Sequence, residues 1–77
     1  MELFGKRVKE LRIEQAITQR QAAKEFGVTE VTWQRYVAGH TPSFRNCVAL
    51  ADYFNVSLDY LIGRSVHRTR YSKQEEE

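Results

Sequence analysis

Apolar residues recur every three or four positions along most of the chain, which is the spacing that buries one face of a helix. In residues 1–15, Val8 and Leu11 share a face with Leu3 or Phe4, and charged residues fill the other positions. Gly5 has a low helix propensity, so we expect the first turn of this helix to fray. A second run has its apolar positions at Phe44, Cys47, Val48, Leu50, Ala51 and Phe54.

Between these two segments, the chain carries start and stop signals for two shorter helices. Thr18 is a favourable N-cap with Gln21 three positions later, and Gly27 suits the left-handed end of a helix. Thr29 then caps a further helix, which we expect to stop at Gly39. Two short helices joined by a tight turn form the helix-turn-helix pattern.

The apolar residues of these two short helices are expected to face each other. Trp33 and Tyr36 also suggest stacking on unpaired bases, but their spacing places both on the inner face, which favours core packing. Because Trp33 is large, we expect one of its edges to reach the surface. The predicted inner face consists of Ala22, Ala23, Phe26, Val28, Trp33 and Tyr36.

The remaining signals complete an all-α prediction. Pro42 ends the preceding segment, Ser43 caps a helix that ends near Asn55, and Ser57 caps a last short helix closed by Gly63. We therefore predict a compact five-helix bundle in residues 1–63. Residues 64–77 are charged and lack apolar periodicity, so they are predicted to be a mobile tail.

The chain resembles the Cro- and phage-repressor-type (lambda-repressor-like) family of DNA-binding domains, and the resemblance is carried by TQRQAAKEFGVTEVTWQRY, residues 18–36. The flanking segments KRVKELR (6–12) and LADYFNVSLDYLIG (50–63) extend it to about residues 4–63. The resemblance implies a transcriptional regulator, with repression as its expected role, that binds double-stranded DNA through the second helix of the motif.

Base contacts are implied for the start of this recognition helix, which enters the major groove with its N-terminal residues nearest the bases. Arg35 can form a fork of hydrogen bonds with guanine, and Gln34 can pair with adenine. Glu30 can accept from the cytosine amino group, and Val31 can contact the thymine methyl group. The alternative for each is an exposed residue without a ligand. The candidates are Glu30, Val31, Thr32, Gln34 and Arg35.

Phosphate contacts are expected from the start of the first motif helix and from the loops. The resemblance implies that Gln19 binds a phosphate where free backbone N–H groups add partial positive charge. Thr29 is partly committed to capping its own helix, and Arg20 is as well explained by solvent exposure as by contact. The candidates are Gln19, Arg20, Thr29, Thr41, Arg45 and Asn46.

Composition narrows the function classes. With 42% hydrophobic and 29% charged residues, the chain is typical of a soluble globular protein; no signal peptide is visible, and a cytoplasmic location is expected. Cys47 is the single cysteine, and His40 and His67 lack metal-ligand spacing, so we expect no disulfide, metal, cofactor or enzymatic activity. The net charge of +2 divides into +3 for residues 1–45, −2 for 46–63 and +1 for 64–77.

Two function classes stay open at this point. The first is a sequence-specific DNA-binding regulator that dimerises on a near-palindromic operator, and the second is an antitoxin-like or adaptor module that uses the same fold to hold a protein. The polar residues of the recognition helix favour DNA, although the acidic Glu30 would repel phosphate unless it meets a cytosine. The dimer contact is expected on the two last helices, where surplus apolar surface is predicted at Phe54, Leu58, Tyr60 and Leu61.

One departure from the family pattern concerns Arg12. In many relatives the matching arginine pairs with a glutamate near the end of the recognition helix, but Val37 occupies that position here. A buried charge without a partner is costly. Arg12 can turn its head to solvent over an aliphatic stem, or it can donate to the free carbonyls near Val37 and Ala38; the second route is the one we predict.

Overall fold

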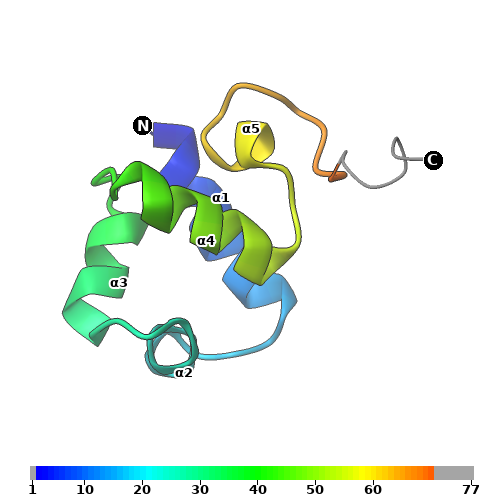
Figure 1. The fold of residues 1–77 in the computed structure, drawn as a ribbon. Helices are drawn as coiled ribbons and strands as arrows, with labels where there is room; N and C mark the ends of the chain where they lie inside the picture. Colours follow the sequence, from blue (N-terminus) through cyan, green and yellow to red (C-terminus); the bar gives the residue numbers. More distant parts are fainter. Residues whose placement is uncertain (1, 71–77) are drawn as a thin grey trace.

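The structure, a computed structural model, describes residues 2–70 and folds them into five helices (Figure 1). In chain order these are α1 (Glu2–Glu14), α2 (Gln19–Phe26), α3 (Glu30–Val37), α4 (Phe44–Phe54) and α5 (Leu58–Leu61). No strand occurs in residues 2–70, so the predicted all-α bundle is confirmed. Within the same residues, no helix has the length and apolar character needed to cross a membrane.

The predicted N-caps are present, and α2 and α4 end at the predicted left-handed residues, whereas α3 has its C-cap at Ala38, one residue before the predicted Gly39. The Thr18 hydroxyl accepts a hydrogen bond of 3.0 Å from the Gln21 N–H, and Gly27 ends α2 with φ of 92°. Asn55 ends α4 in the left-handed conformation, with φ of 57°. Side-chain N-caps of the same kind precede α3, α4 and α5, at Thr29, Ser43 and Ser57.

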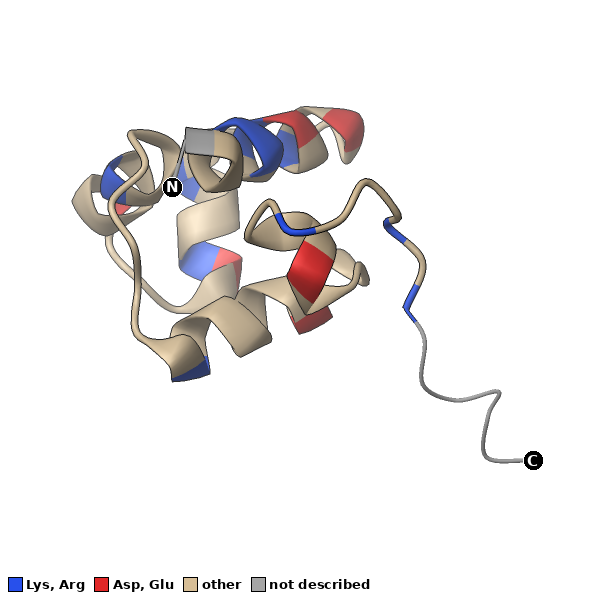
Figure 2. Cartoon of the chain, turned by 90° about the horizontal axis from the view of Figure 1, so that it is seen from above, with Lys and Arg blue, Asp and Glu red and all other residues tan. Residues whose placement is uncertain are grey.

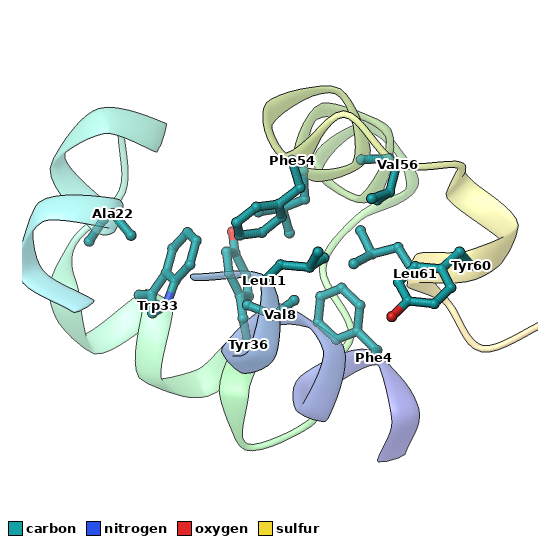
Figure 3. Packing of buried hydrophobic residues seen from close by; sticks show 13 residues of the cluster. Phe4, Val8, Leu11, Ala22, Trp33, Tyr36, Phe54, Val56, Tyr60 and Leu61 are labelled. Atoms are coloured by element: carbon teal, nitrogen blue, oxygen red, sulfur yellow. The ribbon is translucent and has the colours of Figure 1, made fainter. Parts of the chain in front are cut away.

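The core forms where α1 packs against α3 and α5 and where α2 packs against α3 (Figure 3). Trp33 lies between Ala22 and the rings of Tyr36 and Phe54, with centroid distances of 6.0 and 6.2 Å to the two rings. Its side chain is 0% exposed, so the expectation of an exposed edge is wrong. The surrounding aromatic rings provide enough volume to enclose the whole indole.

Gly5 is part of this packing. The expected fraying is not observed, because α1 is helical from Glu2 onwards and Gly5 is buried. A methyl group at Gly5 would overlap the carbonyl oxygen of Val37 and would lie 3.0 Å from that of Tyr36. Gly5 thus allows α1 to approach the C-terminal end of α3 more closely than any side chain would permit.

The predicted partner of Arg12 is wrong. Its Nη1 donates to the carbonyl of Ile17, in the loop between α1 and α2, at 2.6 Å, and its buried Nε has no protein partner in the described residues. Gly5, seven residues and so about 10 Å earlier along α1, is the residue beside the last carbonyls of α3. Arg12 therefore ties α1 to the following loop instead of to α3.

The apolar surface expected on α4 and α5 is also located differently. Phe54, Tyr60 and Leu61 are buried in the core, and Leu58 is half-buried. Phe44, which the helical pattern assigned to the core-facing side of α4, is 73% exposed. Phe44 is the first residue of α4, and side chains at that position point back beyond the helix end and away from the core.

Residues 64–70 run along the bundle and will be called the strap. The sequence predicted a mobile tail here, yet the strap contacts the folded body, for example through Arg68, which donates to Glu14 of α1 at 2.6 and 2.9 Å. Residues 71–77 of the predicted tail lie outside the described residues, and the division of the chain at residue 63 stays a prediction. Polar and backbone contacts of this kind leave no apolar periodicity in the sequence.

Candidate nucleic-acid interface

The outer face of α3 is accessible along its length because the inner face is anchored. Trp33 and Tyr36 are buried and hold the helix against α1 and α2. Thr32 is half-buried. The exposed residues of this face are Glu30, Val31, Gln34 and Arg35, with Val31 64% exposed. The sequence-predicted base contacts therefore lie on one accessible surface, and their contacts with bases stay a prediction.

Two threonines at the start of α3 are linked to each other. The Thr29 hydroxyl accepts the N–H of Thr32 at 3.1 Å and donates to the Thr32 hydroxyl oxygen at 3.0 Å. Each hydroxyl thus has part of its hydrogen-bonding capacity occupied within the helix. Thr29 retains only a small capacity for a phosphate, as the capping pattern suggests.

Glu30 lies in the first turn of α3, where the partial positive charge of the helix N-terminus stabilises a carboxylate. Its side chain is exposed and forms no ion pair in the described residues. A free carboxylate at this position can accept a hydrogen bond from the amino group of a base, and it repels phosphate. Glu30 therefore has a structural reason to be present as well as a possible role in recognition.

The start of α2 presents free backbone N–H groups beside Gln19, which is half-buried, and Arg20, which is exposed. At the other end of α2, the carboxylate of Glu25 accepts a hydrogen bond of 2.6 Å from the Tyr53 hydroxyl on α4. Burial, together with this hydrogen bond, raises the pKa of Tyr53 to about 12. The sequence did not indicate this link, because the two residues are 28 positions apart and no local pattern joins them.

The loop after α3 and the start of α4 hold the other phosphate candidates. Thr41 and Arg45 are exposed. Asn46 is half-buried, and its backbone N–H donates to the Ser43 hydroxyl at 3.2 Å. Burial raises the pKa of Tyr36, and the nearby Asn46 side chain opposes that shift. Asn46 is therefore the least available of these candidates.

Among the described residues, the arginines of the strap form ion pairs, whereas those of α2, α3 and the start of α4 do not. Within residues 2–70, every ion pair involves an arginine of the strap, at Arg64, Arg68 or Arg70. Figure 2 shows the basic positions of the strap along the chain that leaves α5, and in Figure 1 the strap lies at the top of the bundle and α2 at the bottom. The arginines of α2, α3 and the start of α4 form no ion pair in this part of the chain, and these are Arg20, Arg35 and Arg45.

An apolar groove of about 250 Å³ lies beside this surface and will be called the Phe44 groove. Burial raises the pKa of the Cys47 thiol at its floor, so the thiol stays protonated and acts as a small apolar group. The sequence did not indicate the groove, because its pattern assigned Phe44 to the core-facing side of the helix. Its lining residues are Thr41, Pro42, Phe44, Cys47, Leu58 and Ile62.

Comparison with protein families gives one match, to the model described as helix-turn-helix, over residues 8–61. The matched segment runs from the middle of α1 to the end of α5 and contains both helices of the motif. It ends before the strap. No curated protein and no solved structure matches the chain.

Proposed function

The chain belongs to the helix-turn-helix family of the Cro and phage-repressor type, a family of DNA-binding regulatory domains, and from this membership we propose that it binds specific double-stranded DNA sequences as a transcriptional repressor. In this proposal, α3 lies in the major groove and the start of α2 contacts the phosphate backbone.

One observation supports this proposal most directly. The exposed face of α3 carries Gln34 and Arg35, and the arginines around it have no acidic partner in the described residues. Unpaired arginines are available for phosphate oxygens or guanine edges without first breaking an ion pair. The arginines of the strap, by contrast, are already paired with carboxylates of the fold.

Arg35→Ala is expected to weaken binding to the best site by about 1–3 kcal/mol and to relax the preference at one base pair, because it removes a guanine contact. Gln19→Ala should weaken binding by a similar factor on every sequence, because phosphate contacts carry no sequence information. Competition assays on a panel of single-base variants of the site measure both effects. A uniform loss for Arg35→Ala would reassign that residue to the phosphate backbone.

The proposed specificity itself is tested by selecting binding sites from a random DNA pool at two salt concentrations. A sequence-specific domain enriches one motif at both concentrations, and total binding falls as salt rises. Enrichment of no motif, or binding that does not change with salt, would contradict the proposal.

We also propose that a second copy of the chain occupies the Phe44 groove when the protein is on DNA. The groove is lined by five apolar or small residues and Thr41, and none of the six carries a charge. It lies beside the start of α4, next to the proposed phosphate contacts, where two copies on adjacent half-sites would approach each other. Because the contact is small, we expect a monomer at micromolar concentration and a dimer on the operator.

Phe44→Ser is expected to remove dimerisation on DNA and to weaken binding to a two-half-site operator by at least about tenfold, since an exposed aromatic anchor carries much of a small interface. Binding to a single half-site should not change. Gel-shift stoichiometry and sedimentation with operator DNA measure both quantities. Ile13→Ser, which alters a 55% exposed apolar residue on α1, is the matched control and should dimerise normally.

The Phe44 groove also favours the second function class, an antitoxin-like or adaptor module, because an exposed apolar groove suits a protein partner. The outer face of α3 does not favour a protein partner, since Val31 is its only large exposed apolar residue. Failure of the site selection together with an intact, folded domain would favour that alternative.

A further inference from the structure

The strap lies beyond the family match and forms an ion pair with each of three helices. Arg64 pairs with Asp59 of α5 at 4.0 Å. Arg68 pairs with Glu14 of α1 through two nitrogens, and this hydrogen bonding holds the pKa of Glu14 below its ordinary value. Arg70 pairs with Asp52 of α4 at 2.8 Å. One segment of seven residues therefore joins α1, α4 and α5.

Backbone groups of the strap complete the start of α5. The N–H of Ser57, the N-cap of α5, donates to the Arg68 carbonyl at 2.8 Å. The Ser57 hydroxyl donates to the His67 carbonyl at 3.0 Å while it accepts the N–H of Tyr60. Helices as short as the four residues of α5 are unstable by themselves, so the position of α5 depends on such external contacts.

Tyr60 is enclosed by two guanidinium groups. Arg7 of α1 lies 4.0 Å from the centre of its ring, and Arg68 lies 5.4 Å from it. Arg7 also donates to the carbonyls of Tyr60 and Ser65, the latter at 2.9 Å. Arg7 thus binds the α5 aromatic ring, the α5 backbone and the strap.

Isolated exposed ion pairs contribute little to stability, whereas pairs joined in a network with two-nitrogen geometry contribute more. The Arg68–Glu14 pair has the two-nitrogen geometry, and all three arginine pairs hold the same seven-residue segment whose backbone bonds to Ser57. Leu58 of α5 and its C-cap residue Ile62 in turn line the Phe44 groove.

We propose that the strap is an ionic clamp that holds α5 in place, and that dimerisation through the Phe44 groove requires the clamped state. The clamp on α5 concerns the fold alone. The requirement of the clamp for dimerisation rests on the proposed dimer. Because salt screens the arginine pairs, rising ionic strength loosens the clamp and thereby weakens an apolar contact that salt would not weaken directly.

Amide hydrogen exchange at Ser57 measures the clamp directly, because the Ser57 N–H is bonded to the strap and not to a helix. In the wild type, we expect this amide to exchange at least about tenfold more slowly than in an unstructured chain, and to lose protection at 1 M salt. The triple variant Arg64→Gln/Arg68→Gln/Arg70→Gln should lose the protection at low salt, while the amide of Leu50 in α4 stays protected. Arg68→Lys keeps the positive charge but cannot form the two parallel hydrogen bonds to Glu14. This variant should lose part of the Ser57 protection.

The matched control is Arg20→Gln/Arg35→Gln/Arg45→Gln, which removes the same charge from arginines without ion pairs. It should leave Ser57 protection unchanged. A Ser57 amide that is unprotected in the wild type, or still protected in the strap variant, overturns the clamp.

Operator binding tests whether dimerisation through the Phe44 groove requires the clamp. The strap variant should bind a single half-site like the wild type and should lose at least about fivefold in affinity for two half-sites, as expected when an interface loses part of its support. Normal dimerisation of the strap variant overturns the link between clamp and groove. A wild type that never dimerises on DNA overturns the link and the proposed dimer together, while Ser57 exchange still decides the clamp.

Discussion

Gly5→Ala is expected to lower the free energy of unfolding by about 3 kcal/mol or more, the upper range for overpacking a core. The added methyl group would overlap the carbonyl oxygen of Val37 and crowd the Gly39 nitrogen, and both are backbone atoms that cannot move as a side chain can. Alanine gains about 1 kcal/mol in helix propensity, which offsets only part of this cost. Urea denaturation followed by circular dichroism measures the change.

Gly27→Ala is the matched control for Gly5→Ala. Gly27 has φ of 92° and no atom within 4 Å of the added methyl group, so it reports only the backbone conformational cost. That cost is about 1–2 kcal/mol. If Gly5→Ala is no more destabilising than Gly27→Ala, the contact between α1 and α3 is not as tight as described.

Trp33→Ala is expected to lower the free energy of unfolding by about 3–5 kcal/mol, since a fully buried indole leaves a large cavity. This is a large part of the stability of a small domain, so the variant should be partly unfolded at 37 °C. Because the protein has no other tryptophan, circular dichroism melting is the suitable measurement.

Trp33→Phe separates the effect of side-chain volume on stability from the effect of the buried indole N–H. The indole N–H is buried without a hydrogen-bond partner in the described residues, so phenylalanine removes an unpaired donor together with part of the ring. We therefore expect Trp33→Phe to cost less than half as much as Trp33→Ala. Equal losses for the two variants would mean that the N–H has a partner, such as a bound water.

Local chemistry accounts for the parts of the fold that the sequence predicted. The threonine and serine caps and the left-handed ends at Gly27 and Asn55 act within four residues of their own helix, so each boundary is visible in a short window. The end of α1 is the exception. Ala16 adopts a left-handed φ of 59° there, a conformation that its residue type does not announce.

Contacts between distant segments could not be predicted in the same way. Gly5 looks like a weak helix former, and only the neighbouring α3 shows why a side chain is excluded. Arg12 was assigned to the wrong carbonyls because helical spacing does not specify which end of α1 meets α3. The strap uses charged and backbone groups, and these leave a pattern that is indistinguishable from a solvated tail.

In the candidate interface, too, the local features could be predicted from the sequence and the contacts between distant segments could not. The exposed positions of α3 follow from the cap at Thr29 and from the buried Trp33 and Tyr36. The unpaired state of Arg35 and Arg45 does not follow from the sequence, because it depends on where the acidic residues fold. The sequence also did not reveal the Phe44 groove, which combines residues from the loop, α4 and α5.

The strap also has a place in the order of folding. Its hydrogen bonds span the longest stretches of chain among those of the described residues, with 54 positions between Glu14 and Arg68 and 58 between Arg7 and Ser65. Closing such loops costs more entropy than forming the local turn between α2 and α3, so we expect the strap to dock late in folding. Its loss would then accelerate unfolding and leave the folding rate unchanged. During synthesis the strap leaves the ribosome after α2 and α3, so we expect slow unfolding of the domain only once the arginines of the strap are in place.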